Sequence, residues 1–209
     1  MKPLQILAEK YDLVHQESAG GPVINANGDK SWCNANGQYH RLDGPAFINA
    51  DGDKQWWVND KLHRLDGPAI IKANGRKEWW VNSKKHRLDG PAIEWANGSK
   101  EWWVNDERHR LDGPAAEWAN GRKDWYIDSK RHRADGPAVI NANGGTKEWW
   151  VNGERHRLDG PAVEYANGAK DWYIVGQEYT EKEFNRYLKA LKARQDVLNK
   201  DNPGIEMDI

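Results

Sequence analysis

The chain has 209 residues, and its 31 Lys and Arg against 32 Asp and Glu leave a formal net charge of -1. This balance argues against binding to nucleic acid or anionic membranes through overall charge, and one cysteine excludes an intrachain disulfide or a cysteine-based zinc site. Thirteen tryptophans are typical of a folded chain, because disordered chains are poor in aromatic residues.

The first element that the sequence predicts is a short helix within residues 1–20, interpreted as an N-terminal cap. Apolar residues recur there at helical spacing: Leu4, Leu7, Ala8, Tyr11 and Val14. The segment has no apolar run of signal-peptide length, and the chain has no stretch near the ~18 apolar residues of a membrane span. We therefore expect a cytoplasmic protein, with membrane binding disfavoured.

Residues 21–178 carry an internal repeat with a period of 23 residues. The segment His-Arg-Leu-Asp-Gly-Pro-Ala begins at His40, His63, His86, His109 and His156, and a copy with Ala134 begins at His132. The last interval is 24 residues, because one of Gly144 and Gly145 is an extra glycine in a turn. Such regular repetition predicts an array of like units, each packed on its neighbours.

Each unit is predicted to form one β-hairpin. In the unit 90–112, Asn97-Gly98 favours a two-residue type I′ turn, and the flanking residues are of strand-forming types. That turn places Ile93 opposite Trp102 and directs both side chains to one face. The polar segment after the aromatic strand is predicted to be the loop that returns the chain to the next hairpin.

Three apolar columns are predicted to form the core of the array. They comprise Phe47, Ile70, Ile93, Ala116, Val139 and Val163; Trp56, Trp79, Trp102, Trp125, Trp149 and Trp172; and Val58, Val81, Val104, Ile127, Val151 and Ile174. The leucines of the return segments are expected to cover an edge of this core: Leu42, Leu65, Leu88, Leu111 and Leu158.

A second aromatic column is predicted on the opposite face, near a basic column that also includes Lys85. The candidate binding residues are Trp57, Trp80, Trp103, Tyr126, Trp150, Tyr173, Arg108, Arg131 and Arg155. Rings beside cations can stack on sugars or nucleotides. The alternative interpretation is structural, with the rings packed over neighbouring alanines.

The order of turn, aromatic strand and histidine-containing return resembles the MORN repeat. Tyr165-Ala166-Asn167-Gly168 matches the family's turn, and Val151-Asn152-Gly153 leads to His156 as in its return. The Trp-Trp-Val-Asn-Gly and His-Arg-Leu-Asp-Gly-Pro-Ala form is also similar to uncharacterised repeat proteins of bacteriophages and other viruses. The resemblance implies an elongated hairpin array used for protein or lipid contacts, and, if viral, an inhibitor or adaptor that acts on a host factor in the host cytoplasm.

Residues 179–209 are predicted to be a C-terminal capping helix and tail. Thr180 and Glu183 have the spacing of a capping box. Apolar residues then recur at helical spacing and predict an amphipathic helix over about 181–199: Phe184, Tyr187, Leu188, Leu191 and Leu198.

The recurring His-Arg-x-Asp motif is not interpreted as a catalytic or metal site, because every copy occupies an equivalent shallow position rather than one cleft. We predict a mainly β protein, a single-layer elongated array of antiparallel hairpins between helical caps, with no catalytic residue, metal or cofactor. The function we predict is a non-enzymatic module that binds a protein partner along an extended β surface.

Two alternatives stay open. One is a protein that binds or sequesters a nucleotide or sugar through the outer aromatic column, and the other is a structural protein of a virion or membrane. Nucleic acid is a disfavoured partner, and a homodimer through the N-terminal end is a further possibility that the degenerate first repeat suggests.

Overall fold

The computed structural model describes residues 20–201, which divide after Ala119 into two compact units. The helix expected within 1–20 lies outside the described residues. Both units are mainly β, and the second ends in an α-helix, α2 (Glu181–Asp201). The predicted fold class, antiparallel β-hairpins followed by a C-terminal helix, is therefore confirmed.

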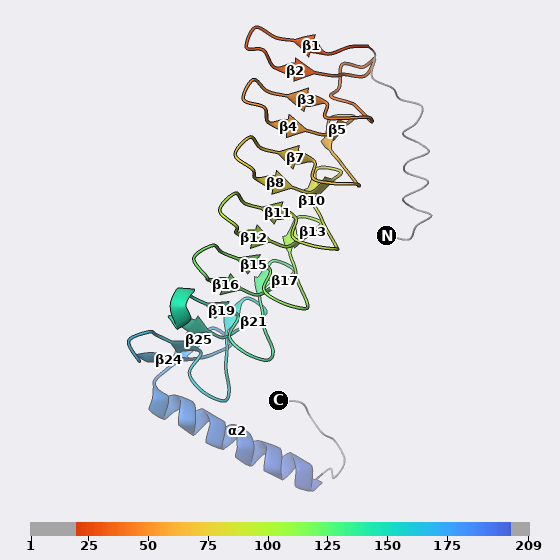
Figure 1. Ribbon diagram of the computed structural model, residues 1–209. Helices are drawn as coiled ribbons and strands as arrows, with labels where there is room; N and C mark the ends of the chain where they lie inside the picture. The colour runs from red at the N-terminus through yellow and green to blue at the C-terminus, as the bar shows by residue number, and fades with distance from the viewer. Residues whose placement is uncertain (1–19, 202–209) are drawn as a thin grey trace. The chain divides into compact units, whose positions relative to one another are not determined.

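In the first unit, the strands of the main sheet follow one another in chain order, and paired neighbours are antiparallel. They are β1 (Val23–Ile24), β2 (Lys30–Ser31), β3 (Phe47–Ile48), β4 (Lys54–Gln55), β7 (Ile70–Ile71), β8 (Lys77–Glu78), β11 (Ile93–Glu94), β12 (Lys100–Glu101) and β15 (Ala116–Glu117). Figure 1 shows successive hairpins of this unit side by side. Each 23-residue step thus adds two strands.

Each of three repeats in this unit also forms a second, smaller hairpin, which the sequence analysis did not predict. These hairpins are β5 (Trp57–Val58) with β6 (Lys61–Leu62), β9 (Trp80–Val81) with β10 (Lys84–Lys85), and β13 (Trp103–Val104) with β14 (Glu107–Arg108). The chain leaves the main sheet at the first tryptophan of each pair: the Trp79 N–H donates to the Ala92 carbonyl at 2.8 Å, and the Trp79 carbonyl accepts from His86 at 3.1 Å. The predicted aromatic strand is therefore two strands separated by a corner.

The turn type predicted at Asn97-Gly98 is wrong. Gly98 donates to the Trp95 carbonyl at 3.0 Å and Trp95 donates to Ser99 at 2.9 Å, so the loop has three residues. Gly98 alone of these has a positive φ, as in a type I turn completed by a glycine bulge. The two-residue turn with both φ values positive lies instead in the small hairpin, at Asn105 (53°) and Asp106 (69°).

The longer loop moves the register by one residue and changes which side chains are buried. Ile93 pairs with Glu101 rather than with Trp102. The column that begins at Phe47 is buried from Ile70 onward, but the tryptophan column is only half-buried. In each unit the core includes alanines with no exposed surface, which the prediction placed on the opposite face: Ala46, Ala69, Ala92 and Ala115 in the first unit, and Ala138 and Ala162 in the second.

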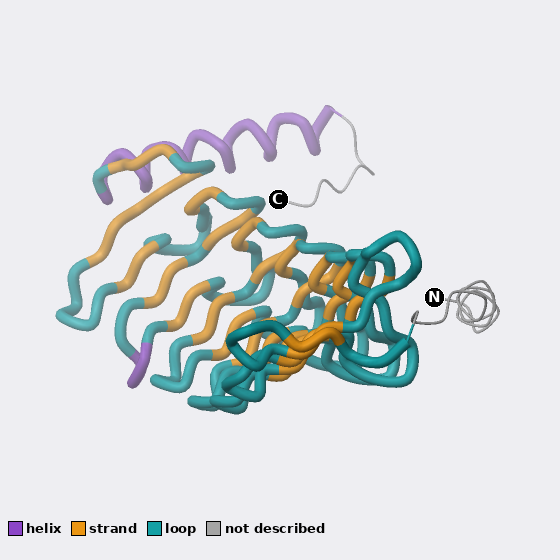
Figure 2. The backbone as a smooth tube through the Cα atoms, turned by 90° about the horizontal axis from the view of Figure 1, so that it is seen from above, coloured by secondary structure: helices purple, strands orange, loops and turns teal. Residues whose placement is uncertain are grey.

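The second unit repeats this arrangement. Its main-sheet strands are β16 (Lys123–Asp124), β19 (Val139–Ile140), β20 (Lys147–Glu148), β23 (Val163–Glu164), β24 (Lys170–Ile174) and β25 (Gln177–Tyr179), and its small hairpins are β17 (Tyr126–Ile127) with β18 (Lys130–Arg131) and β21 (Trp150–Val151) with β22 (Glu154–Arg155). Figure 2 shows these short strands between longer loops. In the last repeat of this unit, which begins at Gly160, the aromatic strand does run unbroken through Trp172, as β24.

The extra residue of the sixth interval lies in the loop after β19, as predicted. A short 3-10 turn, η1 (Ala142–Gly144), fills the loop. The Asn141 N–H still donates to the Thr146 carbonyl at 3.0 Å, and the flanking pair Val139 with Glu148 is intact. The loop therefore absorbs the insertion without changing the residues that pair on either side.

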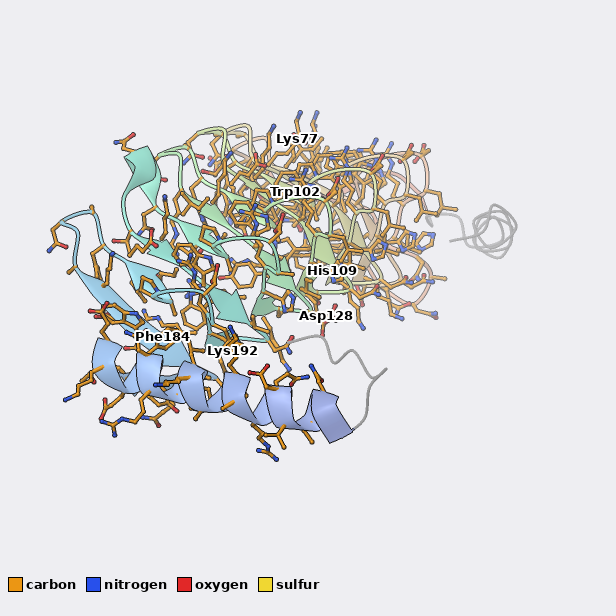
Figure 3. The ribbon with its side chains drawn as sticks, turned by 90° about the horizontal axis from the view of Figure 1, so that it is seen from below. Lys77, Trp102, His109, Asp128, Phe184 and Lys192 are labelled. Atoms are coloured by element: carbon orange, nitrogen blue, oxygen red, sulfur yellow. The ribbon has the colours of Figure 1, made fainter. Side chains whose placement is uncertain are left out.

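The capping box that begins α2 is also confirmed. The Thr180 N–H donates to Glu183 at 2.9 Å, and the Glu183 N–H donates to the Thr180 hydroxyl at 3.3 Å. Phe184 is 2% exposed and lies in the first turns of a helix that contacts β24 and β25 (Figure 3). The helix thus begins by covering the last strands of its unit.

Candidate interaction surface

The predicted binding residues come together as a ladder in which cations alternate with aromatic rings. In the first unit, the Lys85 ammonium lies 4.9 Å from the Trp80 ring and 4.7 Å from the Trp103 ring, and the Arg108 guanidinium lies 4.9 Å from Trp103. Each cation lies opposite a tryptophan in its small hairpin, as in the pair Trp103 and Arg108. The small hairpin is therefore the element that positions this column.

The second unit holds an equivalent ladder. The Arg131 guanidinium lies 5.9 Å from the Tyr126 ring and 5.1 Å from the Trp150 ring. The Arg155 guanidinium follows, at 5.2 Å from Trp150 and 5.3 Å from Tyr173. All five side chains are half-buried. Each cation thus already contacts two rings of its own chain.

Carboxylates that are buried or largely buried hold the polar groups of the ladder. Glu101, 3% exposed, accepts from the indole nitrogens of Trp95 at 3.1 Å and Trp103 at 3.2 Å, and from Arg108 at 2.9 Å. Glu148 accepts in the same way from Trp150 and Arg155. A buried charge costs much free energy unless it is paired and hydrogen-bonded, so the basic column neutralises these acids.

The base and the acid vary together in five of the repeats. The repeat of residues 44–66 has Leu62 where the next four repeats have a cation, and it has the neutral Gln55 where they have a carboxylate. Gln55 still accepts from the Trp57 indole at 3.0 Å. Within each unit, the ring, acid and base side chains thus contact one another, which favours the structural interpretation of the candidate binding residues.

The return segments are ordered by an arginine that lies between a ring and a glycine. The Arg110 guanidinium lies 4.0 Å from the Trp102 ring centroid, and a Cβ placed on Gly113 would be 2.9 Å from its Cζ. Arg110 also donates to Asp112 at 2.8 Å and to the Pro114 carbonyl at 3.2 Å. A glycine therefore suits the position before the proline, because the guanidinium occupies the space where a side chain would lie.

The aspartate of each return segment is bonded but remains in solvent. The hydrogen bond from Arg110 holds the pKa of Asp112 below its ordinary value, and Arg87 does the same for Asp89. Both carboxylates have 84% of their side-chain surface exposed. These acids are therefore ionised at neutral pH and accessible to a partner.

The repeated histidine connects one repeat to the turn of the next. His63 Nδ1 lies 3.0 Å from the Asn82 side-chain oxygen and accepts from the Asn82 N–H at 3.3 Å. His40 contacts Asn59 in the same way. The histidine and aspartate of one motif thus have separate structural partners. Within residues 20–201, no group of three or more His, Cys, Asp or Glu side chains is placed to hold a metal ion.

The leucines of the return segments do not cover the core in the first unit, which corrects the prediction. Their exposed fractions are 43% for Leu42, 41% for Leu65, 67% for Leu88 and 79% for Leu111. The reason is that the adjacent arginine, rather than the leucine, covers the half-buried tryptophan. We call these four side chains the leucine ridge.

An open groove of about 650 Å³ lies between two return segments of this ridge. It is lined by Arg87, Leu88, Asp89, Gly90, Trp102, Val104, His109, Arg110, Leu111 and Asp112; Figure 3 labels Trp102 and His109. The sequence pattern did not identify this groove, although the alternation of apolar Leu with charged Arg and Asp was a signal that the leucine is at a surface. A contiguous apolar patch rimmed by polar residues is typical of a protein-binding surface.

Models of known protein families and curated protein sequences gave no match to this chain. Within the described part of the chain, no helix combines the length and the apolar character that a membrane crossing needs.

Proposed function

We propose that this protein is a non-enzymatic module that binds a protein partner through the return segments of its repeats. The observation that carries the proposal is the leucine ridge, with Leu88 and Leu111 mostly in solvent on either side of a groove. Exposing a leucine forgoes about 2 kcal/mol of the free energy that its burial provides. A regular row of exposed leucines therefore supports a surface that a partner covers.

The outer aromatic column gives less support to the alternative of nucleotide or sugar binding. Its indole nitrogens donate to Glu78, Glu101 and Glu148, and its cations lie against rings of the same chain. A ligand would have to displace these contacts before it could stack. We also propose that the repeat is a variant of the MORN repeat, in which the return segment ordered by arginine replaces the family's glycine-rich return.

Affinity capture with paired variants tests the proposal. The wild-type chain and a Leu88→Ser, Leu111→Ser variant are used as baits in the same native lysate, and captured proteins are rebound in purified form. We expect a stoichiometric partner that the variant loses, while Trp103→Ala, if it folds, retains it. Equal capture by wild type and the leucine variant, or loss only with Trp103→Ala, would refute the proposed surface.

A further inference from the structure

The leucine ridge has a fixed spacing that limits what can lie along it. Within the first unit, successive repeats differ by two paired strands, β7 and β8 then β11 and β12. Neighbouring strands lie about 4.8 Å apart, so equivalent residues of successive repeats recur about every 9.6 Å. A ligand that contacts several repeats alike must present equivalent groups at that interval.

The strand that lines the groove, β13, has hydrogen bonds on both of its sides. It pairs with β14 on one side, and on the other its Trp103 carbonyl accepts from the Arg87 N–H at 3.1 Å. An added strand would also present side chains on one face about every 6.7 Å, which does not match the repeat. The partner therefore binds by its side chains rather than by extending the sheet.

A polyproline II helix matches the repeat more closely than an α-helix does. It has three residues per turn at about 3.1 Å each, so one face recurs about every 9.3 Å. An α-helix returns to nearly the same face after seven residues, about 10.5 Å. Over the three steps from Leu42 to Leu111, the mismatch accumulates to about 1 Å for polyproline II and about 3 Å for the α-helix.

The groove also has the lining that such a ligand needs. Proline-rich segments bind in grooves walled by aromatic and apolar side chains, and here Trp102, Val104 and the two leucines line one groove. The two leucines come from the two return segments between which the groove lies. A proline ring of the ligand is rigid and would enter this groove at little cost in conformational entropy.

The exposed aspartates of the groove select the sign of the ligand. Arg87 is bonded to Asp89 and Glu94, and Arg110 is bonded to Asp112 and Glu117. Each guanidinium is thus shared between an aspartate that lines the groove and a glutamate that does not. Because Asp89 and Asp112 are almost fully in solvent, a cation of the ligand reaches them without displacing the arginines.

We propose that the leucine ridge binds a proline-rich segment of a partner protein in polyproline II conformation, with a lysine or arginine at every third position. This inference rests on the proposed function and names the chemistry of the partner. The prolines pack between leucines of successive repeats, and each basic residue lies against the exposed aspartate of one return segment.

Fluorescence anisotropy with labelled synthetic peptides tests the inference. The probe is a peptide of about twelve residues made of Pro-Pro-Lys triplets. The controls are a peptide of the same composition with its lysines in one block, the Pro-Pro-Glu equivalent, and an alanine-rich α-helical peptide of the same charge. We expect the triplet peptide to bind at least about tenfold more tightly than each control.

Protein variants separate the two contributions. Asp89→Asn with Asp112→Asn is expected to weaken the triplet peptide about threefold to tenfold at low salt and much less at high salt. Leu88→Ser with Leu111→Ser is expected to weaken it about tenfold. Val23→Ser is the matched control, because Val23 is 66% exposed in the same unit and does not line the groove. Circular dichroism checks that each variant is folded.

The inference is overturned if the blocked-lysine or the helical peptide binds as tightly as the triplet peptide, or if the leucine variant binds it normally. Its failure is distinguishable from failure of the proposed function. If no peptide binds but capture of a purified partner still requires Leu88 and Leu111, only the polyproline inference is wrong. If capture ignores both leucines, the interaction surface itself is wrong.

Discussion

Replacing Gly113 with alanine is expected to destabilise the first unit by displacing Arg110. The added Cβ would lie 2.9 Å from Cζ of Arg110 and near 3.1 Å from two guanidinium nitrogens, which is too close. Arg110 would then leave the Trp102 ring, 4.0 Å away, and the Pro114 carbonyl. The ring contact contributes about 1 kcal/mol and the hydrogen bond about 1 kcal/mol, whereas the exposed pair with Asp112 adds little. Alanine restricts the unfolded chain and returns about 0.5 kcal/mol, so the expected net loss is about 1.5 kcal/mol.

A double-mutant cycle in urea, followed by circular dichroism, isolates this cause. Gly113→Ala is compared in the wild-type chain and in an Arg110→Ala background, where there is no guanidinium to displace. The expected effect is a loss of about 1.5 kcal/mol in the first and a gain of about 0.5 kcal/mol in the second. Gly98→Ala is the matched control: Gly98 has φ +87° and open space around its Cβ, so its backbone strain should cost the same in both backgrounds. An equal effect of Gly113→Ala in both backgrounds would refute the reasoning.

Three further predictions concern other parts of the network. Val175 has φ 48° where other repeats have asparagine or aspartate, so Val175→Asn should stabilise the second unit by about 1 kcal/mol in thermal unfolding; no gain would mean that the turn is not strained. Glu101→Gln and Arg108→Leu should each destabilise the first unit by about 2 kcal/mol or more in urea unfolding. The double variant copies Gln55 and Leu62, and its cost should be at least about 1 kcal/mol smaller than the sum of the two single costs. Strictly additive costs would exclude the proposed pairing. The arginines of the return segments hold the pKa of four aspartates below the ordinary value near 3.8: Asp43, Asp89, Asp112 and Asp135. The contribution of these aspartates to stability is therefore complete above pH 3.8 and is lost as pH falls through the lower, folded-state pKa. Carboxyl chemical shifts followed by NMR in a pH titration should show midpoints below 3.8, and midpoints at or above 3.8 would contradict the Arg–Asp bonds.

The sequence was sufficient to predict the repeat, its hairpins and the C-terminal helix, because each depends on local signals. Asn-Gly pairs mark a loop, and the Thr180 and Glu183 spacing marks a helix start whatever the tertiary context. The position of the insertion at Gly144 and Gly145 was predictable for the same reason. These features need no knowledge of which residues meet across the structure.

The register and the burial of the return-segment leucines depended on such contacts and were predicted wrongly. Asn-Gly suits either a two-residue turn or a three-residue loop with a glycine bulge, and that single residue determines whether Glu101 or Trp102 lies opposite Ile93. The corner at the first tryptophan depends on the Trp79 bond to Ala92 of the next repeat. The leucines were assigned to the core on hydrophobicity alone, whereas the arginines beside them cover the tryptophans instead.

The loop after β19 shows where foreign sequence can enter this protein. It already holds one residue more than its counterparts, and the strand pairs on both sides keep their register. A short epitope, or a cysteine for a fluorophore in a Cys33→Ser background, placed beside Gly144 and Gly145, therefore marks the chain with least disturbance of its sheet. Each label introduced there leaves the ridge and its groove in the first unit unmodified for binding measurements.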